Sequence, residues 1–180
     1  GVEQRKALMA KAGHMPHVLS LTATPIPRSL ALTLYGELDI SVLAEKPAGR
    51  QPIMTKIVSP VKRDRLYQDI LGEIEAGRQA FVVCPSIEAR DVSQESRGAA
   101  VEAVYDELRK KQLKGCRIGL LHGRMKADEK EAVMQQFVGR ELDVLVATTV
   151  IEVGVDVPNA SIMVIESAER FGLAQLHQLR

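Results

Sequence analysis

The feature that most constrains the fold is the alternation of short apolar runs with segments of helical periodicity. The runs AFVVC (80–84), RIGLL (117–121) and LDVLVAT (142–148) have the length and composition of buried strands. Between them, apolar side chains recur at helical spacing. Strands joined by helices predict a parallel sheet covered on both faces, because each crossover packs back onto the sheet with the same right-handed sense. The predicted fold class is therefore α/β.

Three helices are expected around these strands, and Gly77 can close the first of them. A further extended segment, MTKIVS, is expected at 54–59, and the polar stretch 89–99 is interpreted as a flexible loop. The apolar faces of the three helices consist of Leu66, Ile70, Leu71 and Ile74, then Val101, Val104, Tyr105 and Leu108, then Val133 and Phe137.

A linker is expected where the periodicity breaks. EKPAGRQPI (45–53) carries two prolines and a glycine among mixed charges. Before it, a strand at 17–22 leads into a short helix that Pro27 can begin. The predicted organisation is a first region at 1–47, a linker at 48–53 and a second region at 54–180.

Composition narrows the function class only a little. The net charge is +1, so no global field draws the chain to nucleic acid or to a membrane. Cys84 and Cys116 form no C-x-x-C motif, and no signal peptide or long apolar span is present, which favours the reducing cytoplasm. No metal site is expected, because the histidines lack the spacing of metal ligands; they are His14, His17, His122 and His177.

Ligands of open parallel sheets bind beyond the carboxyl ends of the strands. Four stretches follow directly after a predicted strand: TATPIPR, PSIE, LHGRM and TTVIEVGVD. All four are expected along one edge, which makes this edge the candidate functional site.

Two of these stretches carry groups that suit a phosphate. In LHGRM, Gly123 permits close approach of a ligand and Arg124 offers a forked cation. Thr148 and Thr149 can offer hydroxyls and N–H groups to a sugar-phosphate backbone. An ordinary strand-to-helix turn with a hydrogen-bonded structural His122 explains the first stretch equally well.

The remaining polar groups of TTVIEVGVD suit a nucleotide sugar. Gly154 would allow close approach, and Asp156 could accept hydrogen bonds from a sugar hydroxyl. A turn aspartate after strand-forming threonines is the alternative, and spacing alone does not separate the two.

The stretches TATPIPRSLA, LHGRMKADEKEAVMQQF, LVATTVIEVGVDVPNASIMVIE and ERFGLAQLHQLR together resemble the RecG family of bacterial ATP-dependent DNA helicases. TATPIPR and GLAQLHQLR are also similar to the transcription-repair coupling factor, a related superfamily 2 translocase. The resemblance implies two RecA-like lobes with ATP bound between them and DNA running across them. Residues 1–47 would be the end of the first lobe, and most of the second would follow the linker.

The resemblance also assigns roles to residues of this sequence. It implies that Thr22, Ala23 and Thr24 couple the nucleotide state to DNA. Gly154, Asp156 and Gln178 would bind the nucleotide, and Arg124, Thr148 and Thr149 would contact DNA phosphates. The implied small-molecule partners are ATP and Mg²⁺, and the implied macromolecular partner is branched DNA. The implied location is the bacterial cytoplasm, in association with the nucleoid.

The sequence departs from the RecG pattern in ways that bear on activity. It contains no G-x-x-x-x-G-K-[ST] loop and no acidic Walker B tetrad. It stops before the glycine-arginine repeat, so Arg180 is not an arginine finger, and neither the rest of the first lobe nor the family's amino-terminal wedge domain is found. We expect a piece of a longer protein that remodels stalled forks and Holliday junctions in repair and recombination, with this piece inactive on its own.

Two other classes of function compete with this interpretation. A non-catalytic module that binds the DNA backbone is the alternative; at 3% aromatic residues and no tryptophan, a base-stacking platform for single strands is disfavoured. A dinucleotide-dependent enzyme would need G-x-G-x-x-G after a strand, and the sequence lacks that pattern.

Overall fold

The computed structural model describes residues 52–85, 94–148 and 157–179, together with Leu19 and Ser41. The chain divides into two units, Gly1–Lys46 and Pro47–Arg180. Every helix and strand below belongs to the second unit. The strand expected at 17–22 and the helix expected from Pro27 lie outside the described residues, and the division into 1–47, 48–53 and 54–180 stays a prediction.

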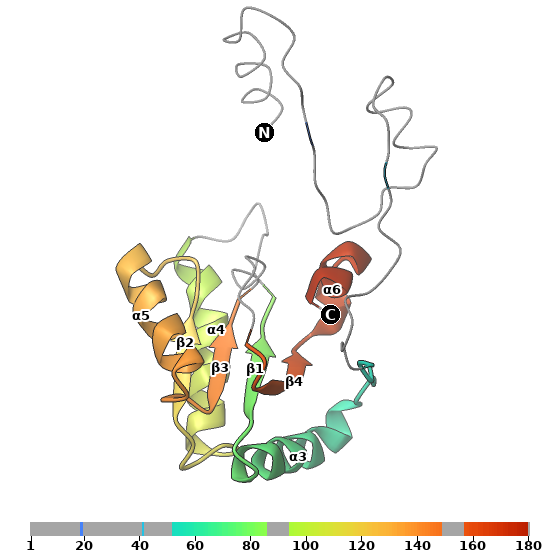
Figure 1. Cartoon of the computed structure of the whole chain (residues 1–180). Coiled ribbons are helices and arrows are strands. Elements are labelled where there is room, and N and C mark those ends of the chain that lie inside the picture. The colour runs from blue at the N-terminus through green and yellow to red at the C-terminus, as the bar shows by residue number, and fades with distance from the viewer. Residues whose placement is uncertain (1–18, 20–40, 42–51, 86–93, 149–156, 180) are drawn as a thin grey trace, which may run out of the picture. The chain divides into compact units, whose positions relative to one another are not determined.

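The centre of the second unit is a sheet of four parallel strands in the order β2-β3-β1-β4 (Figure 1). In β1, Val83 pairs with Ala147 of β3 and Ile165 of β4, and in β2 Leu121 also pairs with Ala147. The four strands therefore end at the same edge. Their bounds are Gln79–Val83 for β1, Ile118–Leu121 for β2, Val144–Ala147 for β3 and Ala160–Ile165 for β4.

Helices cover both faces of this sheet. Alternation along β1 explains why: Ala80 and Val82 join one buried cluster, whereas Phe81 and Val83 join the other. The first cluster includes residues of α3 and α4, and the second includes Phe137 of α5 and residues of the carboxyl-terminal segment. The predicted parallel α/β fold with helices on both faces is confirmed. The helices are α3 (Arg63–Glu75), α4 (Gln94–Lys110), α5 (Ala127–Val138) and α6 (Leu173–Leu179), with short 3-10 turns at Pro60–Lys62 and Ala168–Arg170.

Glycine is required at two places in this framework. Gly77, expected to close the first helix, has φ +79° and donates its N–H to Ile74 O at 2.9 Å. In β2, a Cβ added at Gly119 would lie 2.6 Å from Leu142 Cδ1. The Leu142 side chain therefore packs directly against the β2 backbone.

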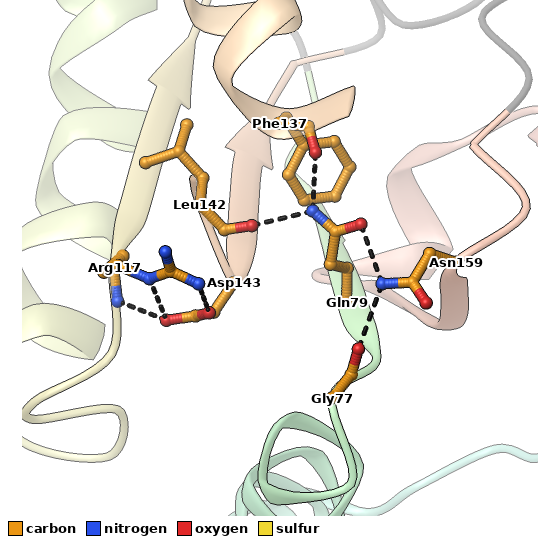
Figure 2. A network of polar contacts seen from close by, with 7 residues as sticks. All are labelled: Gly77, Gln79, Arg117, Phe137, Leu142, Asp143 and Asn159. Atoms are coloured by element: carbon orange, nitrogen blue, oxygen red, sulfur yellow. Dashed lines mark hydrogen bonds and ion pairs between the residues drawn. The ribbon is translucent and has the colours of Figure 1, made fainter. Parts of the chain in front are cut away.

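A buried polar network ties the elements together at the amino edge of the sheet (Figure 2). The amide nitrogen of Gln79, a residue only 3% exposed, donates to Phe137 O at 2.6 Å and to Leu142 O at 2.7 Å. Its oxygen accepts a hydrogen bond of 3.0 Å from Asn159 Nδ2, which also donates to Gly77 O at 3.1 Å. One side chain thus joins the end of α5, the entry to β3, β1 and the turn before β4.

An ion pair adds a second bond at the same edge. The guanidinium of Arg117 meets Asp143 through Nε at 3.2 Å and Nη2 at 2.5 Å, and the Arg117 backbone N–H also donates to Oδ2 at 2.8 Å (Figure 2). These bonds hold the starts of β2 and β3 in register.

Three expectations differ from the structure. Residues 54–59 form no strand, because none of the described strands lies beside them to pair with their backbone. The expected loop at 89–99 is wrong from Gln94 onward, where α4 already begins; Gln, Glu, Arg and Ala are good helix formers. Strand β4 was not expected. Among the described residues, no helix is long and apolar enough to cross a membrane.

Candidate functional site at the carboxyl edge of the sheet

The carboxyl edge carries one short polar segment after each strand. Backbone hydrogen bonds extend the ladder one residue past the strands: Thr148 N–H donates to Leu121 O at 3.1 Å, and Cys84 N–H donates to Ala147 O at 2.7 Å. The expectation of a shared edge is therefore confirmed for Pro85, 122–125 and Thr148. The stretch TATPIPR lies outside the described residues.

Of the site residues expected in the TTVIEVGVD stretch, the structure describes Thr148. It is 5% exposed, and its backbone is held by β2. Its position at the strand end is the expected one, while its contact with DNA stays a prediction. Several other expected site residues lie outside the described part of the chain: Thr22, Ala23, Thr24, Thr149, Gly154 and Asp156.

The turn between β2 and α5 is fixed by hydrogen bonds on both sides of Gly123. Met125 N–H donates to His122 O at 3.2 Å, and Lys130 Nζ donates to Gly123 O at 3.0 Å. At the start of α5, the Glu129 carboxylate accepts the Lys126 N–H at 3.0 Å, so the acidic residues here support the helix amino terminus. Arg124 therefore projects from a well-supported backbone.

Arg124 is exposed but paired. Its Nη2 donates to Glu102 Oε1 at 2.8 Å, and the two side chains are 43% and 48% exposed. The same oxygen lies 3.6 Å from His122 Nε2, and the His122 side chain is only 13% exposed. His122 Nδ1 is buried and has no hydrogen-bond partner among the described residues. A purely structural His122 would be expected to have hydrogen-bond partners for both ring nitrogens, whereas Nδ1 has none in the described part of the chain.

A second polar cluster lies where β4 ends, and the sequence interpretation missed it because β4 was not expected. Glu166 Oε1 accepts hydrogen bonds from Tyr67 Oη at 2.5 Å and Arg63 Nη2 at 3.1 Å. Arg63 also lies 3.7 Å from Glu107 and 5.6 Å from the Tyr67 ring centroid. The apolar run IMVI before Glu166 was the signal that could have revealed this strand.

The pKa shifts in this cluster favour a structural role for its side chains over a catalytic one. Burial, and then the hydrogen bond to Glu166, raise the pKa of Tyr67, so the phenol stays protonated. Burial raises the pKa of the neighbouring Cys84 to about 12, with Glu166 adding to the effect. A thiol held protonated is a poor nucleophile. Cys84 and Cys116 are both free.

Gln178 lies on α6, and its side chain is exposed. The helix starts where Gly172 N–H donates to Gln175 Oε1 at 3.1 Å. Leu176 and Leu179 pack against the second buried cluster, which anchors the helix. Nucleotide binding by Gln178 stays a prediction.

Metal binding finds no support in the described part of the chain. Within these ranges, no three His, Cys, Asp or Glu side chains lie together in a group that could hold a metal ion.

The sheet and its polar edge match a known class of domain. The family model described as "Helicase conserved C-terminal domain" matches residues 61–180. The match covers most of the chain, and the chain belongs to this family. The parallel sheet with helices on both faces is accordingly that of a RecA-like carboxyl-terminal helicase lobe.

Curated relatives that match the whole chain share one name. Over its full length the chain is 52% identical to the ATP-dependent DNA helicase RecG of Synechocystis sp. and 51% identical to that of Mycobacterium tuberculosis. The chain spans only 21% and 26% of the length of these two proteins. The likeness to RecG expected from the motifs is confirmed.

A solved structure overlaps the chain more weakly. The Hef helicase domain of Pyrococcus furiosus is 24% identical over 65% of this chain and 23% of its own, with a TM-score of 0.43. This overlap is too partial to bear on the assignment.

Proposed function

We propose that this chain is part of an ATP-dependent DNA helicase that moves on duplex DNA and remodels branched structures. The observation that carries the proposal is its 52% identity along the whole chain to a protein named ATP-dependent DNA helicase RecG. The carboxyl edge supports it, because the segments that resemble helicase motifs follow β2 and β3, two neighbouring strands.

The proposed work of this lobe is to hold DNA without reading its sequence. Arg124 gives a phosphate a forked cation on a fixed turn, Thr148 and Thr149 give hydroxyls, and Thr149 also gives its N–H to the adjacent DNA backbone. The Thr148 N–H is already bonded to Leu121 O. Such contacts position a strand and are equally strong for every sequence. That property suits a motor that must step along DNA.

The nucleotide would be bound beside this contact. ATP is the substrate, and in the proposed arrangement Asp156 accepts hydrogen bonds from its sugar while Gly154 allows the close approach. Gln178 on α6 would face the same nucleotide, and Thr22, Ala23 and Thr24 would couple its state to DNA. Magnesium would accompany ATP and neutralise charge on its phosphates, held by acidic residues that this sequence lacks.

We expect these residues alone to hydrolyse no ATP. The sequence has no phosphate loop and no glycine-arginine repeat. An arginine finger alone contributes roughly a thousandfold or more to turnover. The proposed setting is a longer bacterial protein, in the cytoplasm and near the nucleoid, that acts on stalled forks and Holliday junctions in repair and recombination. The rest of the first lobe and a wedge domain would complete it.

The test uses this chain within the longer protein that carries the phosphate loop and the arginine repeat. ATP hydrolysis is measured with and without forked DNA for the starting protein and for Asp156→Ala and Thr149→Ala. Exposed residues give matched controls, Asp69→Ala and Thr55→Ala. We expect fork-stimulated turnover that both site variants lose and both controls keep.

The opposite result would favour the other class of function. Turnover that is absent, or that ignores both DNA and the two site substitutions, would contradict the motor. If duplex DNA still bound with a steep dependence on salt, the chain would be a non-catalytic module that holds the DNA backbone.

A further inference from the structure

His122 and Arg124 direct nitrogen atoms at a single oxygen, and that oxygen belongs to a different element. Arg124 Nη2 lies 2.8 Å from Glu102 Oε1, and His122 Nε2 lies 3.6 Å from the same atom. Glu102 is on α4, whereas the other two residues follow β2. The carboxylate oxygen thus occupies the position of an anion between the Arg124 guanidinium and the His122 imidazole.

The two nitrogen donors and the carboxylate differ in how firmly they are held. The backbone of the turn is fixed by the Met125 and Lys130 hydrogen bonds, and the His122 side chain is only 13% exposed. Glu102 is 48% exposed on the surface of its helix. A solvent-exposed ion pair is weak, so an incoming anion can displace this carboxylate at little cost.

We propose that His122 and Arg124 form one binding site for a phosphate of the nucleic-acid backbone, and that Glu102 is its resident competitor. This inference rests on the proposed function and deepens it, since it adds His122 to the DNA contact and names the residue that sets its affinity. Phosphate oxygens replace the carboxylate when DNA binds, and the carboxylate returns when DNA leaves. A contact with such a built-in competitor is easily broken, as a moving protein needs.

The direct test compares two substitutions on the same helix in the longer protein. Glu102→Gln removes the competitor. Asp106→Asn removes one negative charge about one turn away, where the carboxylate pairs with Lys110 at 2.9 Å. Affinity for a short duplex is measured across a range of salt concentrations.

We expect Glu102→Gln to tighten binding about fivefold at low salt, the effect of freeing one exposed ion pair. The slope of log K against log salt should steepen by up to about one, because one more phosphate contact is made in full. Asp106→Asn should change affinity less than about twofold. Equal effects of the two substitutions would overturn the proposal, since they would reflect only the net charge of α4.

A double-mutant cycle tests whether Glu102 acts on DNA binding through Arg124. In an Arg124→Ala background, the gain from Glu102→Gln should disappear, because the partner that it frees is no longer there. His122→Asn should weaken duplex binding in the otherwise unchanged protein. A full gain from Glu102→Gln without Arg124 would contradict the shared site.

A measurement without DNA separates this inference from the proposed function. Inorganic phosphate is titrated into the protein while NMR follows the ring protons of His122. Phosphate should shift these signals at a lower concentration in Glu102→Gln than in Asp106→Asn. If Glu102→Gln binds phosphate more tightly but the protein binds no DNA, the anion site is supported and the proposed motor function is contradicted. If the two variants give identical titrations, the anion site itself is contradicted.

Discussion

The polar side chains at the two edges of the sheet differ in how completely they are buried and paired. At the amino edge, the Gln79 side chain is buried and engages two carbonyl groups and Asn159, while Arg117 and Asp143 pair through two side-chain bonds (Figure 2). At the carboxyl edge, Arg124 is exposed, and the Glu102 oxygen to which it bonds also lies beside His122.

The difference shows which edge is available for binding. A polar group buried with all its partners contributes to stability and has nothing left to offer a ligand. A half-exposed charge contributes little to stability and can exchange its partner. Changes at the amino edge should therefore alter the free energy of unfolding, whereas changes after β2 should alter binding.

The largest expected effect is at the amino edge. Gln79→Leu should lower the free energy of unfolding by about 3 kcal/mol, because it leaves two buried carbonyl groups and Asn159 without their partner. Urea denaturation at neutral pH measures the change. Gln135→Leu is the control, at an exposed glutamine whose side chain bonds to Glu131, and should stay within about 0.5 kcal/mol. If Gln79→Leu also changed the free energy of unfolding by less than about 0.5 kcal/mol, the amino edge would not be the stabilising edge.

The second prediction concerns Tyr67, which is fully buried although its hydroxyl bonds to Glu166 at the carboxyl edge. Tyr67→Phe should cost about 2 kcal/mol of stability, the size of a hydrogen bond to a charged acceptor. Tyr105→Phe is the matched control, since that half-buried residue has no hydroxyl bond in the described part of the chain. Thermal or urea unfolding measures both. Weaker DNA binding without lost stability would place Tyr67 in the binding site instead.

The third prediction concerns the turn after β2. Arg124→Ala should weaken binding to every duplex sequence alike and flatten the salt dependence by about one unit of slope. Stability should change by less than about 0.5 kcal/mol, since the pair with Glu102 is exposed. Arg109→Ala, an exposed arginine near the end of α4, controls for net charge. Sequence-dependent losses would indicate base readout and contradict a backbone contact.

The smallest expected effect is a pH dependence at the amino edge. Hydrogen bonds from Arg78 and then Ser161 lower the pKa of Glu73 to about 2 from a usual 4.5. A carboxyl group with a lowered pKa adds stability above pH 4.5 that is lost as the pH falls toward 2. Glu73→Gln should therefore cost less than about 1 kcal/mol at pH 7, given the exposed partner, and almost nothing near pH 2.

Urea midpoints at several pH values test this dependence. Glu75→Gln, at an exposed glutamate of the same helix, should cost little at any pH. A cost of Glu73→Gln that does not shrink in acid would show that Glu73 acts through packing and not through its charge.

Much of the fold followed from periodicity, and the exceptions have physical reasons. β1, β2 and β3 were expected because their apolar runs are flanked by helical segments, and Gly77 was expected to close α3. The start of α4 was missed because its first turns are polar, so no apolar face marks them. β4 was not expected, because its apolar run follows a polar turn and no segment of helical periodicity flanks it as one flanks the other strands.

The candidate site was predicted in outline and corrected in detail. The rule that ligands bind beyond parallel strand ends placed Arg124 and Thr148 at one edge, and the strand register confirms that placement. The pairing of Arg124 with Glu102 could not be predicted, since the two residues are 22 positions apart on separate elements. The Arg63–Tyr67–Glu166 cluster joins residues about a hundred positions apart and was equally out of reach.

The sequence by itself determined the parallel α/β architecture, the edge that carries polar groups and the likeness to RecG. Each of these depends on local patterns: apolar spacing, residues after strands, and short motifs. Only the tertiary structure decided which charges are already paired. That outcome depends on how α3 and α4 pack against the sheet, because packing sets the distances between side chains that the sequence keeps far apart.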